Sequence, residues 1–133
     1  MIGHTSQKAP SIAAPSGAVR HILRLEGAVV AGAALIAYTH LGASWWLFAL
    51  AVAAPDLSIV AYLAGPRTGA LAYNLAHSTV GPVLLGIFAC LAGAILPVAV
   101  ALIWVFHIGV DRMLGFGLKH ASGFKDTHLG PIG

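Results

Sequence analysis

Residues 104–120 read WVFHIGVDRMLGFGLKH, an apolar run that passes into basic, glycine-rich sequence. His107 and Asp111 are four residues apart in this stretch, so on a helix they share one face. An ionisable group on a helix surface that faces lipid is costly. If the apolar run crosses a membrane, the pair therefore indicates a polar site in the interior of the protein.

The composition of the whole chain is that of a membrane protein. Of its 133 residues, 59% are hydrophobic and 8% are charged, which is about a third of the charged share of a soluble domain. A soluble domain of this size could not bury so much apolar surface, so the excess is expected to face lipid. The net charge is +3, and Lys and Arg stand at the ends of apolar runs, where they suit lipid head groups. We therefore expect membrane lipid as a partner and no nucleic acid, whereas the oligomeric state is not specified.

Four apolar runs are each long enough to cross a bilayer as a helix. We expect these helices at residues 25–41, 45–64, 68–91 and 97–115. The three turns between them are very short, which forces neighbouring helices to run antiparallel. The sequence thus predicts an all-α fold, an integral-membrane up-down bundle of four transmembrane helices.

Basic residues predict the orientation of the bundle. Arg20 and Arg24 precede the first helix, Arg67 lies between the second and third, and Lys119 follows the fourth, whereas the other two turns carry no Lys or Arg. Because basic residues remain on the cytoplasmic side, both termini are predicted to be cytoplasmic.

The transmembrane domain, residues 20–118, is flanked by two polar segments. Residues 1–19 are rich in Ser, Pro, Ala and Gly and are predicted to form a disordered N-terminal arm. Residues 119–133 are predicted to form a cytoplasmic C-terminal tail without helical periodicity. A solvated tail is the favoured interpretation, and in the alternative residues 125–128 fold back over the cytoplasmic mouth of the bundle.

Four ionisable residues on three helices are predicted to lie at one depth. Asp56, His77, His107 and Asp111 lie about 9 to 15 Å from the cytoplasmic ends of their helices, at roughly 1.5 Å per residue. Each should face the interior and have a polar partner there. Two imidazoles and two carboxylates suit Zn²⁺, Mn²⁺ or Fe²⁺, with Mg²⁺ as a further candidate. The sequence therefore predicts a site for one divalent metal ion.

Three further residues are assigned to the same site. Glu26 on the first helix is shallower but could reach the site, and it is the candidate general base. Asn74 and Tyr73 lie about one turn before His77 and are candidate contacts to a substrate. His40 is expected at the opposite side of the membrane, outside the site.

Each of these polar residues also has a purely structural interpretation. His77 could be hydrogen-bonded to a carbonyl, and Asp56 could cap a helix that restarts after a kink at Pro55. Asp111 and Glu26 could simply pair with nearby basic residues. Their shared depth favours a common site over these alternatives.

Five motifs are specific enough to be compared with known families. They are LRLEG (23–27), APDLS (54–58), YLAGPRTGALAYNLAH (62–77), WVFHIGVDRMLGFGLKH (104–120) and GFKDTHLG (123–130). They resemble the domain of unknown function 4260 family, small bacterial membrane proteins with no established activity. The resemblance implies a small multi-helix protein of the bacterial cytoplasmic (inner) membrane, and it implies no reaction.

A second, partial similarity is to membrane-bound metal-dependent hydrolases of the LexA-regulated type. Thr39-His40, Pro55-Asp56-Leu57, His77-Ser78 and the pair His107 and Asp111 occur in the order of that pattern. Ser58 stands where a second Asp is expected, and Ala72-Tyr73 stands where the pattern has His-Arg. The similarity implies hydrolysis at a metal site and would include His40, which the depth argument excludes.

Two functions of different classes follow. The leading hypothesis is a metal-dependent hydrolase of a lipid or lipid-linked substrate, with Glu26 as general base and Asp56, His77, His107 and Asp111 as metal ligands. The alternative is a non-enzymatic membrane bundle whose polar cluster serves packing, a partner protein or solute passage. A third alternative is a haem group bound by His77 and His107. It is less favoured, because the neighbouring carboxylates suit a hard metal ion better.

Overall fold

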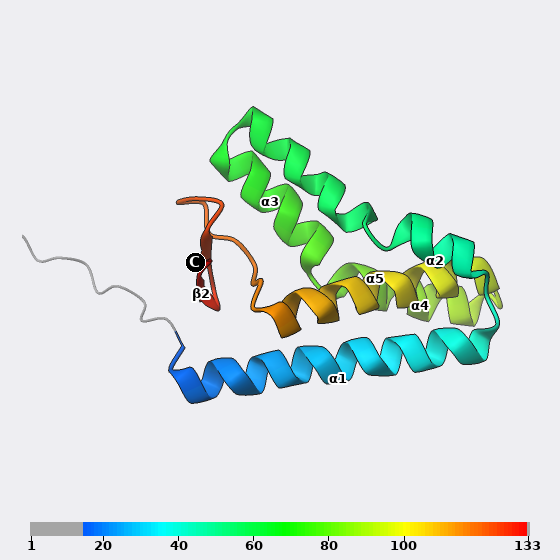
Figure 1. Cartoon of the computed structure of the whole chain (residues 1–133). Coiled ribbons are helices and arrows are strands. Elements are labelled where there is room, and N and C mark those ends of the chain that lie inside the picture. The colour runs from blue at the N-terminus through cyan, green and yellow to red at the C-terminus, as the bar shows by residue number, and fades with distance from the viewer. Residues whose placement is uncertain (1–14, 133) are drawn as a thin grey trace, which may run out of the picture.

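The computed structural model describes residues 15–132 (Figure 1). Its helices are α1 (Gly17–Leu41), α2 (Trp45–Ala51), the 3₁₀ helix η1 (Ala54–Ala64), α3 (Pro66–His77), α4 (Val80–Leu91) and α5 (Ile95–Leu114). Most of the predicted disordered arm, residues 1–19, lies outside the described residues. Its last three residues already belong to α1, so the helical domain begins earlier than expected.

Four stretches of the described chain are helices long and apolar enough to cross a membrane. They are Gly17–Leu41, Trp45–Ala64, Pro66–Leu91 and Ile95–Leu114. Large side chains such as Trp46, Leu50 and Leu63 are exposed on them, as expected where the outer surface of a bundle contacts lipid. The predicted all-α membrane fold with four spans is confirmed.

Two of the four spans are interrupted, and prolines explain both breaks. α2 ends at Ala51, four residues before Pro55, and α3 ends immediately before Ser78, four residues before Pro82. Proline has no N–H to bond the carbonyl four residues earlier, and its ring clashes with that carbonyl. The expected uninterrupted helices over 45–64 and 68–91 are therefore each two shorter helices.

η1 and α3 form a hairpin that leaves the layer of the other helices at an angle (Figure 1). α3 packs chiefly on η1, whereas α1 and α4 pack on α5. Gly69 permits the close packing inside the hairpin, because a Cβ there would stand 2.2 Å from the Tyr62 ring. The η1–α3 hairpin is thus held together mainly by its own contacts.

α1 and α5 approach each other through small residues. A Cβ on Gly109 would lie 2.7 Å from the backbone nitrogen of Ala31 and 2.8 Å from the carbonyl oxygen of Gly27. Small residues allow membrane helices to pack at such short range. Arg24 of α1 also donates a hydrogen bond from Nε to the Met113 carbonyl, at 2.7 Å. This packing fixes α5 in the segment that carries His107 and Asp111.

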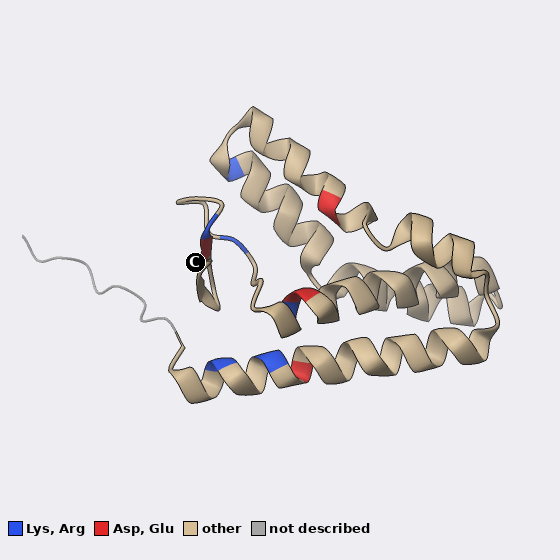
Figure 2. Ribbon diagram, viewed as in Figure 1, with Lys and Arg blue, Asp and Glu red and all other residues tan. Residues whose placement is uncertain are grey.

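Within residues 15–132, Lys, Arg, Asp and Glu lie in one half of the molecule (Figure 2). Figure 2 shows the coloured residues in the half that contains the start of α1 and the end of α5, with none around the α1–α2 and α4–α5 turns. The uncharged end is instead packed around the buried residues Tyr38, Ala99 and Ile103. The alternation of basic and uncharged turns expected from the sequence is therefore present in space.

The segment after α5 folds back on the bundle, so the expectation of a solvated tail was wrong. Strands β1 (Asp126–Thr127) and β2 (Gly130–Pro131) pair antiparallel. Lys119, Thr127 and Leu129 are buried. The segment can be buried because its polar groups find partners in the hairpin and in its own strands.

Candidate metal centre

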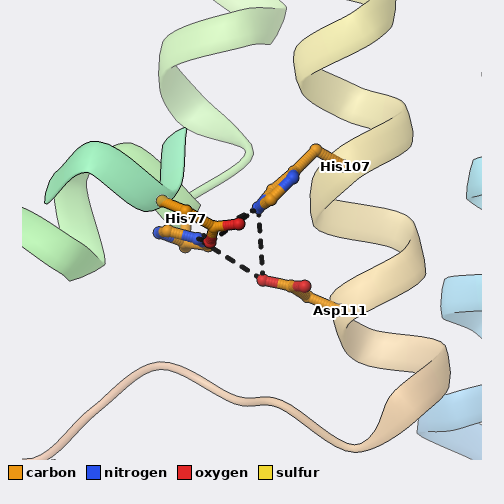
Figure 3. A group of neighbouring side chains, drawn as sticks. His77, His107 and Asp111 are labelled. Atoms are coloured by element: carbon orange, nitrogen blue, oxygen red, sulfur yellow. Dashed lines mark hydrogen bonds and ion pairs between the residues drawn. The ribbon is translucent and has the colours of Figure 1, made fainter. Parts of the chain in front are cut away.

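Asp56, His77, His107 and Asp111 converge on one point. Asp56 belongs to η1, His77 is the last residue of α3, and His107 and Asp111 lie one turn apart on α5. Figure 3 shows His77 approaching from one side while His107 and Asp111 approach from α5. Each of the four offers one ligand atom, and these atoms all lie within 4.8 Å of one another. The structure thus brings together the four residues that were expected at one depth, and they could hold a metal ion.

The spacing of the four ligand atoms is that of a metal coordination shell. His77 Nε2 lies 3.3 Å from Asp56 Oδ1 and 3.4 Å from Asp111 Oδ2. His107 Nε2 lies 3.3 and 3.5 Å from the same two oxygens, and 3.2 Å from His77 Nε2. Tetrahedral ligands at about 2.0–2.2 Å from an ion are separated by about 3.3–3.6 Å. The four separations between a histidine nitrogen and a carboxylate oxygen fall in this range, and the separation of the two Nε2 atoms is just below it.

The orientation of His77 leaves its Nε2 lone pair directed at the cluster. Its Nδ1 lies 2.9 Å from the carbonyl oxygen of Tyr73. A carbonyl can only accept a hydrogen bond, so Nδ1 carries the proton and Nε2 of the neutral ring does not. Metal-bound histidines are commonly oriented by such a bond to a backbone carbonyl. The structural interpretation of His77 is thus correct for Nδ1, while Nε2 remains available as a ligand.

This arrangement needs a positive charge at its centre. The Nε2 lone pair of His77 faces two carboxylate oxygens at 3.3 and 3.4 Å. Three electron-rich atoms at this range repel one another unless a proton or a metal ion lies between them. A divalent cation would also offset the two carboxylate charges. The more buried of the two, Asp111, would otherwise carry its charge there at a cost.

Residues of α5 stabilise the break that ends α3 beside the cluster. The indole Nε1 of Trp104 donates a hydrogen bond to the Ala76 carbonyl. Arg112 donates from Nη2 to the His77 carbonyl at 3.1 Å and from Nη1 to the Phe116 carbonyl at 2.7 Å. Carbonyls freed by a helix break inside a membrane need such partners. Arg112 therefore positions His77, and the expected pairing of Asp111 with a basic residue is replaced by its contacts with the two histidines.

The cluster is accessible from one side. His77 is fully buried, whereas the Asp56 side chain is 48% exposed. Both aspartates line a cavity of about 330 Å³, whose other walls are Ile59, Tyr73, Phe116, Lys119, Phe124 and Ile132. We call this space the tail cavity, because the segment after α5 forms much of its wall. It gives a ligand direct access to the metal-binding atoms.

Glu26, the expected general base, lies outside the cluster of potential metal ligands. It lies in a separate pocket with Arg112 and His128. The group of potential metal ligands in the described residues does not include it. The reason is geometric, since Glu26 precedes Gly27 and α1 contacts α5 on a different face from the one that carries the ligands.

Asn74 also has a different role from the expected contact to substrate. Its Nδ2 donates to the Lys119 carbonyl at 2.8 Å, and its Oδ1 accepts from the Lys119 amide at 2.7 Å. Both polar ends of the amide are thus used to hold the chain after α5. Tyr73 does line the tail cavity, and its ring stacks on His77 with centroids 3.7 Å apart. His40 lies at the far end of α1, where its Nδ1 contacts the Ile36 carbonyl, as expected.

Lys119 and Trp104 are parts of this region that the sequence did not reveal. Lys119 is only 4% exposed, but its burial depends on the folding back of the tail, which leaves no local signal. Trp104 lies three residues before His107 on the same helix, and this spacing could have indicated a shared face.

The helices place this protein in the class of multi-pass helical membrane proteins. The cluster adds a potential metal-binding centre between the spans. The chain belongs to the family described as domain of unknown function (DUF4260), whose model matches residues 20–132. No curated protein and no solved structure matches it. The family resemblance seen in the motifs is therefore confirmed, and the similarity to metal-dependent hydrolases is not.

Proposed function

We propose that this protein is a metal-dependent hydrolase that acts on a lipid or lipid-linked substrate inside the membrane. The observation that carries the proposal is the convergence of the ligand atoms of Asp56, His77, His107 and Asp111, five of whose separations are 3.2–3.5 Å. A divalent ion held by these residues, with a further coordination position toward the cavity that both aspartates line, would polarise a scissile bond and lower the pKa of a bound water. The location between apolar helices favours a substrate that is itself dissolved in the membrane.

The aspartates can serve the reaction as well as the metal. The contacts to the histidines use Oδ1 of Asp56 and Oδ2 of Asp111, and each carboxylate has a second oxygen that could accept a proton. Asp56 is the better candidate, because it is more exposed than Asp111 and faces the tail cavity. This assignment replaces Glu26 as general base.

The ligand types favour Zn²⁺ or Mn²⁺ among the candidate ions. Imidazole nitrogen suits zinc and other transition metals. Mg²⁺ prefers six oxygen ligands at octahedral positions. Two of the four candidate ligands are histidine nitrogens, so the set suits Mg²⁺ less well. One Zn²⁺ or Mn²⁺ ion per chain is therefore proposed.

Elemental analysis of the full chain in mild detergent tests the metal. We expect about one divalent ion per wild-type chain and its loss in His77→Ala and Asp56→Ala. His40→Ala is the matched control, because His40 is a histidine of the same chain far from the cluster, and it should retain the ion. The metal proposal fails if the wild type is metal-free and gains no thermal stability from Zn²⁺, Mn²⁺ or Mg²⁺, since a ligand of the native state must stabilise it.

The hydrolase activity has its own test. The metal-loaded wild type, reconstituted with a total bacterial lipid extract, should release a water-soluble head group or a free fatty acid. His107→Ala under the same conditions should release none. A metal-loaded protein without any such product would leave the metal site intact and contradict hydrolysis.

A specific observation also favours a structural role as second candidate. The cluster joins the η1–α3 hairpin to α5, and the hairpin otherwise packs mainly on itself. A cluster that serves packing, a partner protein or solute passage would lower stability when mutated without loss of a metal. The metal analysis above therefore separates this non-enzymatic role from the enzyme.

The proposal includes the location and orientation of the protein. We place it in the bacterial cytoplasmic membrane with both termini in the cytoplasm, because Arg24 hydrogen-bonds to Met113 at the end of α5 and Arg67 lines a pocket with Ala121 of the C-terminal segment. Reporter fusions after Gly42 and Gly93 should be external, and fusions after Arg67 and Gly133 should be internal. An external C-terminus would reverse the orientation of the site.

A further inference from the structure

Lys119 presents a buried ammonium group to the tail cavity. The residue is 4% exposed, and its Nζ donates one hydrogen bond, to the Phe124 carbonyl at 2.8 Å. Nζ also lies 3.7 Å from the centre of the Phe124 ring and 4.6 Å from that of Tyr73. An ammonium has three N–H groups, so two donors remain for a further partner.

Lys119 forms no direct ion pair within residues 15–132, and Asp111 acts on its charge only from a longer distance. The ion pairs in this part of the chain all join the two histidines to Asp56 and Asp111. A buried charge normally has an oppositely charged partner, because its desolvation is costly. Burial accordingly lowers the pKa of Lys119, and the neighbouring Asp111 carboxylate opposes this shift. The side chain is thus placed as a receptor for an anion.

The anion would lie between two positive groups. A divalent ion is offset by Asp56 and Asp111, which leaves the Lys119 ammonium uncompensated in a cavity that both aspartates line. A phosphate group has several terminal oxygens that point in different directions. One can face the metal while another accepts hydrogen bonds from lysine, which is a common phosphate-binding residue.

A second cavity, lined in part by the chain neighbours of two cluster residues, is apolar. It has a volume of about 280 Å³ and is lined by Ala51, Ala54, Pro55, Ala76, Val100 and Trp104. Pro55 and Ala76 directly precede the ligands Asp56 and His77 in the chain. A molecule at the metal could therefore place a hydrocarbon chain in this cavity and a polar group in the tail cavity.

We propose that the substrate site takes a lipid phosphate, with the phosphate held between the metal-binding cluster and Lys119 and the hydrocarbon chain in the apolar cavity. The inference rests on the proposed metal site and assigns the substrate class to it. Lys119 is the residue that makes the site specific for an anion, and Ala54 and Val100 belong to the wall that selects a lipid over a free phosphate.

Binding to the full chain in a non-ionic detergent tests this assignment. The probes are dodecyl phosphate, inorganic phosphate and dodecanoate, titrated calorimetrically into protein whose Zn²⁺ content is measured in the same sample. We expect dodecyl phosphate to bind more tightly than either of the other two. Lys119→Met should weaken its binding about tenfold or more, as for loss of a charged hydrogen bond. Lys119→Arg should largely retain it, and Lys125→Met, a change at an exposed lysine of the same segment, should have no effect.

Several results would overturn the inference. Equal binding of dodecanoate and dodecyl phosphate contradicts the choice of phosphate, and equal binding of inorganic phosphate contradicts the lipid. If Lys119→Met does not fold, Ala54→Phe replaces it, and this variant should abolish the preference for dodecyl phosphate over inorganic phosphate. A metal-containing protein with no Lys119-dependent binding refutes this inference alone. A metal-free protein that binds dodecyl phosphate through Lys119 refutes the proposed metal function and supports the phosphate site.

Discussion

Asn74 holds the backbone of Lys119 with both ends of its side-chain amide, although the two residues are 45 positions apart. This pair is the link between the η1–α3 hairpin and the segment that follows α5. It places the only buried lysine of the described chain against the tail cavity. The candidate metal ligands and the wall of the tail cavity are thus connected through α3.

Asn74→Ala should release the segment after α5 without removing the metal. The substitution leaves a buried backbone N–H and C=O of Lys119 without partners, which costs about 1–3 kcal/mol each when such groups stay buried. We therefore expect faster amide hydrogen exchange over residues 118–130 and unchanged metal content. The control is Ser122→Ala, which removes a hydrogen bond between exposed side chains. Equal exchange in the Asn74 variant and the wild type would contradict this role.

His107→Ala and Asp111→Ala should have the same effect, and their combination should add little. If both residues bind one ion, removal of either loses it, and residues that act as a unit are not additive. The measurements are metal content and melting temperature for both single variants and the double variant. Additive losses of stability with the metal retained would support a packing role, and neutralising Asp111 could then even stabilise the protein.

Gly109→Ala should destabilise the bundle, whereas Gly32→Ala should not. A Cβ on Gly109 would meet the backbone of α1 at 2.7 Å, and a Cβ on Gly32 has nothing within 4 Å. Crowding of this kind costs about 1–3 kcal/mol, while alanine is otherwise the better helix former by about 1 kcal/mol. We expect a lower melting temperature and weaker metal retention for Gly109→Ala only, because the shift of α5 moves His107 and Asp111. Identical behaviour of the two variants would show that the α1–α5 contact is not tight.

The fold-back of the C-terminal segment should weaken at acid pH through His128. Its Nδ1 accepts a hydrogen bond from the Leu118 amide at 2.8 Å, which requires an unprotonated nitrogen. Partial burial and the positive charge of Arg112 lower the pKa of His128. Because the folded pKa is below the unfolded value of about 6.5, the stabilising contribution is complete above that pH and is lost as the pH falls through the lower value.

Hydrogen exchange of residues 118–130 between pH 7.5 and 5 measures this effect, after correction for the intrinsic pH dependence of exchange. Protection should decrease toward acid pH in the wild type and become independent of pH in His128→Gln. His120→Gln, at an exposed histidine of the same segment, should behave as the wild type. Persistent pH dependence in His128→Gln would assign the titration to another group.

The sequence predicted the spans and the four ligands because both depend on local information. Hydropathy is a property of each run by itself, so four membrane-spanning helices followed from it. The depth of Asp56, His77, His107 and Asp111 followed from counting residues along these helices. Once the helices are packed, ionisable groups at one level in lipid have few places to lie except next to one another.

The features that the sequence did not predict are the helix break after His77 and the fold-back of the C-terminal segment. The first depends on a proline, and the second depends on contacts between distant segments. The break after His77 could have been read from Pro82, whose ring excludes the carbonyl of Ser78 from a helix. The fold-back of the tail could not have been predicted from the sequence, because it depends on a contact between Asn74 and Lys119, which are 45 residues apart. Glu26 was expected to reach the site from a shallower position, and its position along α1 does not specify which face of α1 packs on α5.

The two proline breaks also have a consequence for motion. Only Val52 and Ala53 separate α2 from η1, and only Ser78 and Thr79 separate α3 from α4, so the hairpin is attached by two short hinges. A rigid-body rotation about these hinges would carry Asp56 and His77 together, away from His107 and Asp111 on α5, and would first have to break the bonds of Trp104 and Arg112 to the end of α3. Ion binding and closure of the hairpin would then be one equilibrium, because an ion held by all four residues favours the closed arrangement.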